Sequence, residues 1–268
     1  MPPTPLSDIE ALRALIAARP LGLFSDIDGT LAPIVERPEG ARITRRCRDL
    51  LQRLIGEGVR VALITGRSLD VAHSLAGLEG VAYAASHGLE FWIDGSTEAV
   101  DVGTYAALVE RVIADVGHLR VLGIAIEDKR TGVAFHYRQT GSEEAARLEI
   151  ERALGSSEAA RRFRRIEGRK VIELRPDVEA SKGTAARRLA HQLGVRSIIC
   201  VGDDRTDVDM FRAVSALAAE GIRARSLAVM SPEIHPDVLE AADYSIEGVE
   251  GVEWLLGEIL KDFRQKTE

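Results

Sequence analysis

Short apolar runs that stop abruptly at polar residues set the architecture of this chain. Three such runs occupy residues 21–25, 59–64 and 80–85, and they end at Asp26, Thr65 and Ser86. Continuous apolar runs of this length are typical of parallel strands buried on both faces. Helical spacing of apolar residues is found at residues 7–19, 42–57 and 69–75, and Ser7 and Glu10 suggest a capping box at the first helix. The alternation predicts a doubly wound α/β fold with a mostly parallel, Rossmann-like core.

The pattern changes after residue 98, which indicates an inserted second domain. A helix over 104–116 precedes strand-like runs at 123–127 and 131–138, and a helix over 142–154 precedes runs at 162–166 and 170–175. The core pattern then returns, with a helix over 182–193, strands at 197–201, 226–230 and 242–246, and a helix over 249–263. We therefore expect a core built from residues 1–98 and 181–268, and an α+β cap domain over 99–180.

Charge and composition limit the partners of the chain. A net charge of −7 argues against a nucleic-acid binder, since such proteins usually carry a basic surface. The apolar positions of residues 9–18 are interrupted by Glu10 and Arg13, which argues against a signal peptide or a membrane span. Cys47 and Cys200 lie far apart and match no zinc or disulfide spacing. We expect a cytoplasmic protein with reduced thiols, no nucleic-acid or membrane partner, and a monomeric or small homo-oligomeric state.

Two carboxylates follow the first apolar run. Asp26 and Asp28 are two residues apart, so both side chains point to the same side of an extended backbone. Carboxylates placed in this way repel each other and need a cation or a shared proton. The pair suits a nucleophile with a nearby general acid, although a turn rich in Asp and Gly would show the same residues.

A second acidic group follows the strand at 197–201. Asp203, Asp204 and Asp207 lie within five positions. A solvated helix N-terminus also favours acidic residues, through the helix dipole, so this structural role is an alternative. Such oxygen ligands also suit Mg²⁺. Lys182 stands at a helix start, where the helix dipole disfavours a cation, so its position predicts a nearby anion.

The order of these segments resembles the four motifs of the haloacid-dehalogenase superfamily of phosphohydrolases. The motif residues are Asp26-Ile-Asp-Gly-Thr-Leu, Thr65, Lys182 and Gly-Asp203-Asp204. The insertion between Thr65 and Lys182 resembles the α/β cap of sugar phosphatases. Several stretches are similar to trehalose-6-phosphate phosphatases: Ile64-Thr-Gly-Arg67, Ser86-His-Gly-Leu-Glu90, Glu127-Asp-Lys129, His136-Tyr-Arg138, Glu173-Leu-Arg-Pro176 and Gly202-Asp-Asp-Arg-Thr-Asp207.

The resemblance implies catalytic roles for four residues. Asp26 would attack phosphorus and form an aspartyl-phosphate intermediate. Asp28 would protonate the departing sugar oxygen and later accept a proton from water. Lys182 and Thr65 would contact the phosphoryl oxygens.

The resemblance also implies a Mg²⁺ site. Asp26, the backbone carbonyl of Asp28 and Asp203 would hold the ion. Asp204 and Asp207 would orient its waters and Lys182.

Substrate-binding residues are implied in both domains. They are Arg67, His87, Glu90, Glu127, Lys129 and Arg138. A helix cap, a structural role or a solvated turn remain alternatives for these residues. We expect His136 and Arg138, two residues apart along one strand, to share a face, and ordinary pairing with a neighbouring strand is the alternative to a binding role.

These features predict a Mg²⁺-dependent hydrolase for trehalose 6-phosphate, which would belong to trehalose biosynthesis. Val208 stands where the resembled family usually has glutamate, so we expect a changed substrate preference if that side chain touches the sugar. Another disaccharide or glycosyl phosphate is the alternative substrate. A phosphosugar mutase and a non-catalytic sugar-binding module are the alternative functions.

Overall fold

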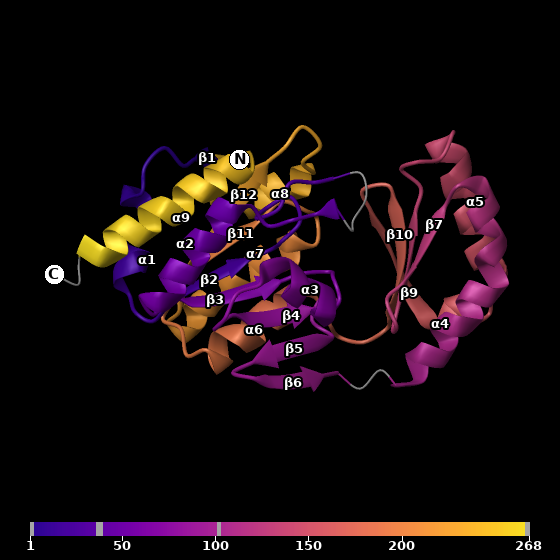
Figure 1. The fold of residues 1–268 in the computed structure, drawn as a ribbon, viewed down its shortest axis with the longest axis horizontal. Coiled ribbons are helices and arrows are strands. Elements are labelled where there is room, and N and C mark those ends of the chain that lie inside the picture. The colour runs from indigo at the N-terminus through magenta and orange to yellow at the C-terminus, as the bar shows by residue number, and fades with distance from the viewer. Residues whose placement is uncertain (1–2, 36–39, 101–102, 266–268) are drawn as a thin grey trace. The chain divides into compact units, whose positions relative to one another are not determined.

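The computed structural model describes residues 3–35, 40–100 and 103–265. The chain divides into two compact units, one formed by residues 1–99 with 180–268 and the other by residues 100–179 (Figure 1). These boundaries lie one residue away from those expected from the sequence. None of the described helices is long and apolar enough to cross a membrane.

The described residues of the first unit, the core, form a nine-stranded sheet. Its order is β1-β13-β12-β11-β2-β3-β4-β5-β6. The strands are β1 Thr4–Pro5, β2 Leu21–Ser25, β3 Arg60–Ile64, β4 Ala82–Ala85, β5 Glu90–Ile93, β6 Ser96–Ala99, β11 Ser197–Gly202, β12 Arg223–Met230 and β13 Tyr244–Glu247. All neighbours pair in parallel except β4 with β5 and β5 with β6. The predicted α/β sheet is confirmed, with an added antiparallel edge.

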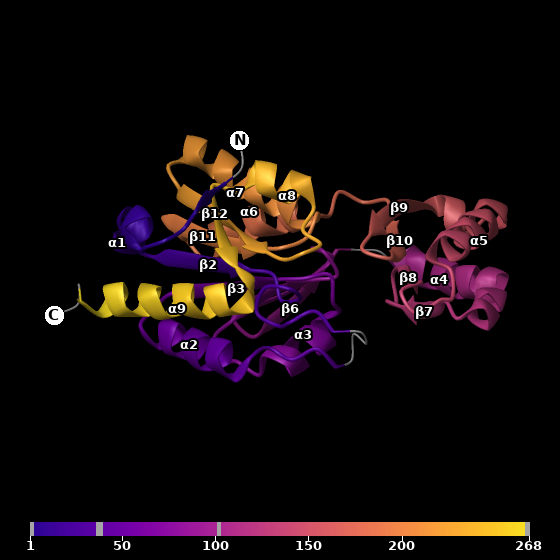
Figure 2. The ribbon, with the colours of Figure 1, turned by 90° about the horizontal axis from the view of Figure 1, so that it is seen from above.

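Helices cover both faces of the core sheet (Figure 2). One face carries α1 Arg13–Ala17, α2 Arg45–Gly56, α3 Leu69–Ala76 and α9 Gly248–Gln265, and the other carries α6 Lys182–Gln192, α7 Asp207–Ala216 and α8 Pro236–Ala241. Successive strand residues pack on opposite faces of the sheet: Leu23 belongs to one buried cluster and Phe24 to the other. Burial on both faces explains why these strands read as continuous apolar runs.

Three local features differ from the sequence predictions. The helix expected over 7–19 is a 3-10 turn, η1 Glu10–Leu12, followed by the short α1, and Asp8 rather than Ser7 accepts the Glu10 N–H at 2.9 Å. The β5–β6 hairpin was not predicted, although Asp94 and Gly95 form its left-handed turn, with φ of 48° and 83°. Helix α8 was also missed; its start is marked by a proline at the first turn.

The second unit is a four-stranded antiparallel sheet with helices on one face (Figure 1). The strand order is β7-β8-β10-β9, with β7 Ala125–Asp128, β8 Val133–His136, β10 Val171–Pro176 and β9 Phe163–Gly168. The main helices are α4 Gly103–Val116 and α5 Glu143–Ser156, and the 3-10 turns are η3 Gly117–Leu122 and η4 Ala160–Arg162. Phe135 and Ile172 pack against these helices in a buried cluster, so the alternate residues of β8 and β10 line the opposite face.

Candidate active site

The candidate catalytic residues of the core lie at its topological switch point. Chain connections run from β2 through β3 to β4 on one side and from β11 through β12 to β13 on the other. Strands β11 and β2 are neighbours, and the Asp26 N–H donates to the Val201 carbonyl at 3.0 Å. In open α/β sheets the crevice at the carboxyl ends of strands on either side of such a point is where ligands bind.

Lys182 joins the carboxylates that follow the two central strands. Its Nζ lies 2.9 Å from Asp26 Oδ2 and 2.8 Å from Asp207 Oδ1. Ser181 caps helix α6 by accepting the N–H groups of Gly183 and Thr184, which fixes the first turn from which Lys182 extends. The lysine is 2% exposed. The sequence predicted an anion near this lysine, and two are present, the carboxylates of Asp26 and Asp207.

Asp207 uses its second oxygen to hold the loop after β11. Oδ2 accepts the backbone N–H groups of Asp203 and Asp204 at 3.0 and 2.9 Å. With Oδ1 facing Lys182, both oxygens of this fully buried carboxylate are committed to the protein. Asp207 therefore holds both the lysine and the Asp203 loop in place.

Three buried carboxylates could bind a divalent cation here. Asp26, Asp203 and Asp207 each offer one oxygen, and these oxygens lie within 4.8 Å of one another. Because Asp207 is already engaged with Lys182 and two backbone groups, Asp26 and Asp203 are the better-placed donors. Hard carboxylate oxygens are the ligands that Mg²⁺ prefers, so the donor set fits such an ion.

The charge balance of the cluster also favours a bound cation. Burial raises the pKa of the Asp26 carboxyl well above its usual range; the charge of Lys182 opposes this shift, and Asp207 and Asp203 add to it. For Lys182, burial disfavours the ammonium, but the carboxylates of Asp207 and Asp26 outweigh it and raise the pKa. One ammonium among three carboxylates leaves an excess of negative charge that a bound cation would relieve.

Close packing brings the loop after β2 onto Asp203. Gly29 has a φ of +80°, and a Cβ added there would lie 2.2 Å from Asp203 Oδ2. Only glycine tolerates both the conformation and the approach. The neighbouring Thr30 hydroxyl donates to Asp203 Oδ1 at 3.4 Å, so this loop also orients the carboxylate.

Arg67 pairs with Asp28 rather than extending alone into the site. Its Nε lies 2.6 Å from Asp28 Oδ2 and its Nη2 lies 2.6 Å from Oδ1. The two residues come from the loops after neighbouring strands β3 and β2. Thr65, 1% exposed, accepts the Arg67 N–H through Oγ1 at 3.2 Å.

His87 and Glu90 belong to a tight turn after β4. Ser86 and His87 both have left-handed backbone angles, with φ of 49° and 56°. His87 is 8% exposed, and a Cβ added to Gly66 would lie 2.3 Å from its Nε2. The Ser86 hydroxyl donates to Glu90 Oε1 at 2.8 Å. Ser86 and Gly66 were not predicted to have a role, although both lie within the family-like stretches of the sequence.

A charged cluster occupies the helix-free face of the second unit's sheet. Lys129 Nζ lies 2.8 Å from Glu173 Oε1, and Arg175 Nη2 lies 2.5 Å from Glu173 Oε2. Glu127 Oε2 lies 2.8 Å from His136 Nε2. Partial burial acts to raise the pKa of Glu127, but the His136 hydrogen bond and the charge of Lys129 outweigh it and lower that pKa.

Two members of this cluster were not predicted from the sequence, and one expected neighbour lies elsewhere. Glu173 and Arg175 were given no role, although alternating charges in an otherwise apolar strand could have indicated them. Arg138 lies in a turn beyond the end of β8, so the expectation that it shares a strand face with His136 was wrong.

Val208 lies in the hydrophobic core and not among polar groups. It is 4% exposed and belongs to the same buried cluster as Phe24 and Phe211. The isopropyl group therefore fills space beneath helix α7. A side chain in this apolar setting gives no support to the expectation that residue 208 touches the sugar.

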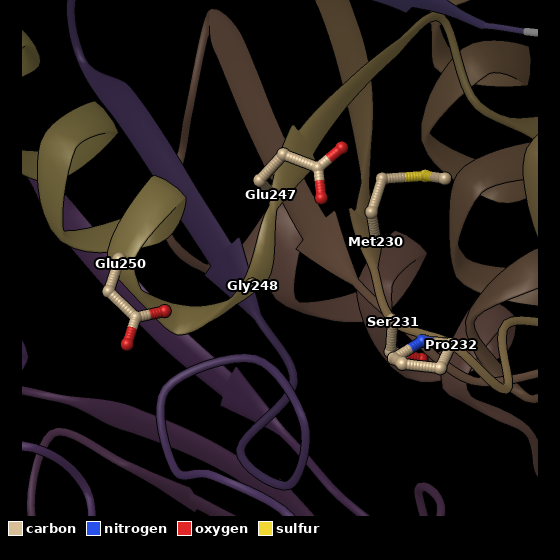
Figure 3. A pocket seen from close by; sticks show the side chains of 6 residues that line it. All are labelled: Met230, Ser231, Pro232, Glu247, Gly248 and Glu250. Carbon is tan, nitrogen blue, oxygen red and sulfur yellow. The ribbon is translucent and has the colours of Figure 1, made fainter.

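A separate pocket of about 470 Å³ lies at the carboxyl ends of β12 and β13 (Figure 3). Its lining residues are Met230, Ser231, Pro232, Glu247, Gly248 and Glu250. Within the part of the chain that the structure describes, two carboxylates and no lysine or arginine line it, a charge pattern that disfavours an anionic phosphate.

Comparison with known proteins gives a family model and several relatives that match this chain. A family model described as trehalose-phosphatase matches residues 24–236. A trehalose-phosphate phosphatase of Mycolicibacterium paratuberculosis is 35% identical over 219 residues, which cover 77% of this chain and 54% of the relative. An uncharacterized glycosyl hydrolase of Mycobacterium tuberculosis is 33% identical over 278 residues, covering 99% of this chain and 20% of that protein. The chain thus spans about half the length of the first relative and a fifth of the second.

Solved structures share the fold. The C-terminal domain of C. albicans trehalose-6-phosphate phosphatase matches with a TM-score of 0.80 at 21% identity, covering 97% of this chain and 99% of that one. A trehalose-6-phosphate phosphatase related protein matches with a TM-score of 0.74 at 24% identity, covering 91% and 99%. The likeness extends over both units.

Proposed function

The chain belongs to the trehalose-phosphatase family, and we propose that it hydrolyses trehalose 6-phosphate to trehalose and inorganic phosphate. The observation that carries the proposal is the buried Asp26 carboxylate, which lies beside Lys182 and Asp203 at the switch point of the sheet. A nucleophile, a fixed cation and a second carboxylate are the groups that covalent phosphoryl transfer needs.

In the proposed reaction, an Asp26 oxygen attacks phosphorus and the bond from phosphorus to the sugar oxygen breaks. Asp28, in its protonated form, gives its proton to the departing sugar oxygen. It then accepts a proton from the water that attacks the aspartyl phosphate, which releases inorganic phosphate and restores Asp26. Asp28 lies two residues beyond the nucleophile and is 36% exposed, so it can reach both the sugar and water.

Lys182 and Thr65 stabilise the transferring group in this proposal. The ammonium of Lys182 already lies 2.9 Å from Asp26 Oδ2, so it stands beside the site of phosphoryl transfer. The Thr65 hydroxyl accepts the Arg67 N–H, which leaves its own hydrogen to donate to a phosphoryl oxygen. Asp204 and Asp207 act by holding this arrangement in place.

Mg²⁺ is the proposed cofactor. Asp26, Asp203 and the backbone carbonyl of Asp28 would hold it, and it would supply positive charge that offsets the repulsion between a carboxylate and a phosphate. The fit rests on the excess negative charge of the carboxylate cluster and on its hard oxygen donors.

We propose that the second unit contributes sugar recognition through Glu127, Lys129 and Arg138, and the core through His87 and Glu90. Charged groups held by partners on an otherwise helix-free sheet face are suited to hydrogen bonding with sugar hydroxyls. Lys129→Met is expected to raise KM for the sugar phosphate more than it lowers kcat.

The test is phosphate release from trehalose 6-phosphate beside a panel of mono- and disaccharide phosphates. It is run with Mg²⁺, with EDTA, and with Asp26→Asn protein. The proposal is supported if phosphate release depends on Mg²⁺, is fastest with trehalose 6-phosphate, and is abolished in Asp26→Asn protein. Preference for another sugar phosphate replaces the substrate but keeps the mechanism. Activity only with an added bisphosphate activator indicates a mutase, and no activity on the panel indicates a binding module.

A further inference from the structure

We propose that Arg67 is a positioning residue that aims the Asp28 carboxyl at the leaving oxygen of the substrate. The inference deepens the proposed function and rests on it. Two guanidinium nitrogens of Arg67 lie 2.6 Å from the two carboxylate oxygens of Asp28. A two-point pair of this kind fixes both the position and the plane of a carboxylate, which a single contact cannot do.

Arg67 is itself held by the turn after β4. The Ser86 N–H donates to the Arg67 carbonyl at 2.7 Å, and the His87 N–H donates to the Thr65 carbonyl at 3.0 Å. The His87 ring packs so closely on Gly66 that a Cβ there would lie 2.3 Å from Nε2. These contacts fix the backbone from which the arginine side chain leaves, and that side chain is 16% exposed.

The energetic effect of the Arg67–Asp28 pair falls on geometry more than on folding. Asp28 is 36% exposed, and ion pairs with such exposure contribute little to stability. A general acid, in contrast, must lie within hydrogen-bonding distance of the oxygen that it protonates. A misplacement of about 1 Å can cost on the order of 10²-fold in rate. Loss of Arg67 should therefore slow proton transfer while leaving the fold intact.

The test compares leaving groups in the first turnover. A sugar alcohol must be protonated as it departs, whereas nitrophenolate is stable without a proton. We would measure first-turnover release of trehalose from trehalose 6-phosphate and of nitrophenol from p-nitrophenyl phosphate. The variants are Arg67→Gln and Arg67→Lys, with Asp28→Asn as the reference for lost acid function. Arg45→Gln is the matched control, since Arg45 is 95% exposed and pairs with Asp49 on the surface of the same unit.

The expected result is a fall of about 10²-fold in trehalose release for Arg67→Gln, with little change in nitrophenol release. Arg67→Lys should recover part of the loss, because a lysine can contact only one carboxylate oxygen at a time. An equal loss on both substrates, or a raised KM with unchanged first-turnover rates, would overturn the inference and make Arg67 a phosphate or sugar ligand.

Failure of the proposed substrate and failure of the positioning role give different results. If wild-type protein does not hydrolyse trehalose 6-phosphate, the proposed substrate fails, and the comparison is made with whichever alkyl phosphate it does hydrolyse. If Arg67→Gln does not fold, Arg67→Lys is read alone. A loss confined to the alkyl phosphate then supports the positioning role, and a loss shared with the nitrophenyl ester refutes it.

Discussion

Replacing Lys182 with methionine removes the ammonium that bridges the proposed nucleophile and Asp207. Nζ lies 2.9 and 2.8 Å from the two carboxylates, and all three side chains are at most 6% exposed. Breaking a buried pair of this kind typically costs about 3–5 kcal/mol, because a charge stays buried without its partner. The pKa of Asp26 is already raised, so that carboxyl can take up a proton and soften the loss. We therefore expect a decrease of about 3 kcal/mol in the free energy of unfolding.

Urea unfolding followed by tryptophan fluorescence measures this change in the core unit, which contains Lys182. The chain has two tryptophans, Trp92 and Trp254, and both belong to the core unit. The control is Lys261→Met, since Lys261 is 70% exposed and pairs with Glu258. Its loss should change stability by less than about 1 kcal/mol.

Added Mg²⁺ should reduce the deficit of Lys182→Met when the experiment is repeated without EDTA. Removing one positive charge strengthens the attraction of the carboxylate cluster for a cation, and at saturating Mg²⁺ each tenfold gain in affinity over wild type recovers about 1.4 kcal/mol of the deficit. A loss below about 1 kcal/mol in EDTA, or a loss that Mg²⁺ leaves unchanged, would refute the charge balance described for this site.

Three further predictions test other parts of the structure. Burial raises the pKa of Tyr83 to about 12 from an ordinary value of 10, so the unfolded state loses this proton at a lower pH than the folded state does. About 2–3 kcal/mol of stability that is present below pH 10 is therefore lost as pH rises toward 12. Tyr83→Phe should remove that loss in urea unfolding at pH 8 and pH 11; an unchanged pH dependence contradicts it. Gly29→Ala should lower kcat by about 10²-fold, since its Cβ would lie 2.2 Å from Asp203 Oδ2; kinetics identical to wild type would contradict the close packing. Val208→Ala should cost about 2 kcal/mol in stability without changing the ranking of sugar phosphates, and a changed ranking would show a substrate contact.

The α/β core could be predicted because its strands are buried on both faces. Runs such as residues 21–25 fit neither a helical nor a half-exposed pattern, and polar residues follow each run at the carboxyl end of its strand. The β5–β6 hairpin escaped prediction because its strands are short and β6 is exposed along its length. Its Asp94-Gly95 turn was the available signal.

The motif residues of the site could be predicted from order and strand context, but their pairing could not. Sequence spacing places Asp26 and Lys182 at converging ends, yet it does not show that Asp207 takes up both Lys182 and the Asp203 backbone. The Arg67–Asp28 pair depends on the side-chain directions of two loops from neighbouring strands. Such contacts are set by register and turn geometry and not by composition.

Mass spectrometry of protein quenched in acid during turnover would detect the aspartyl phosphate itself. If Asp26 is the nucleophile, a phosphoryl group appears on the peptide that contains Asp26, and only when substrate is present. Asp26→Asn protein should then show neither the modified peptide nor phosphate release. Turnover that persists in Asp26→Asn, or a phosphoryl group carried by another residue, would contradict this role of Asp26.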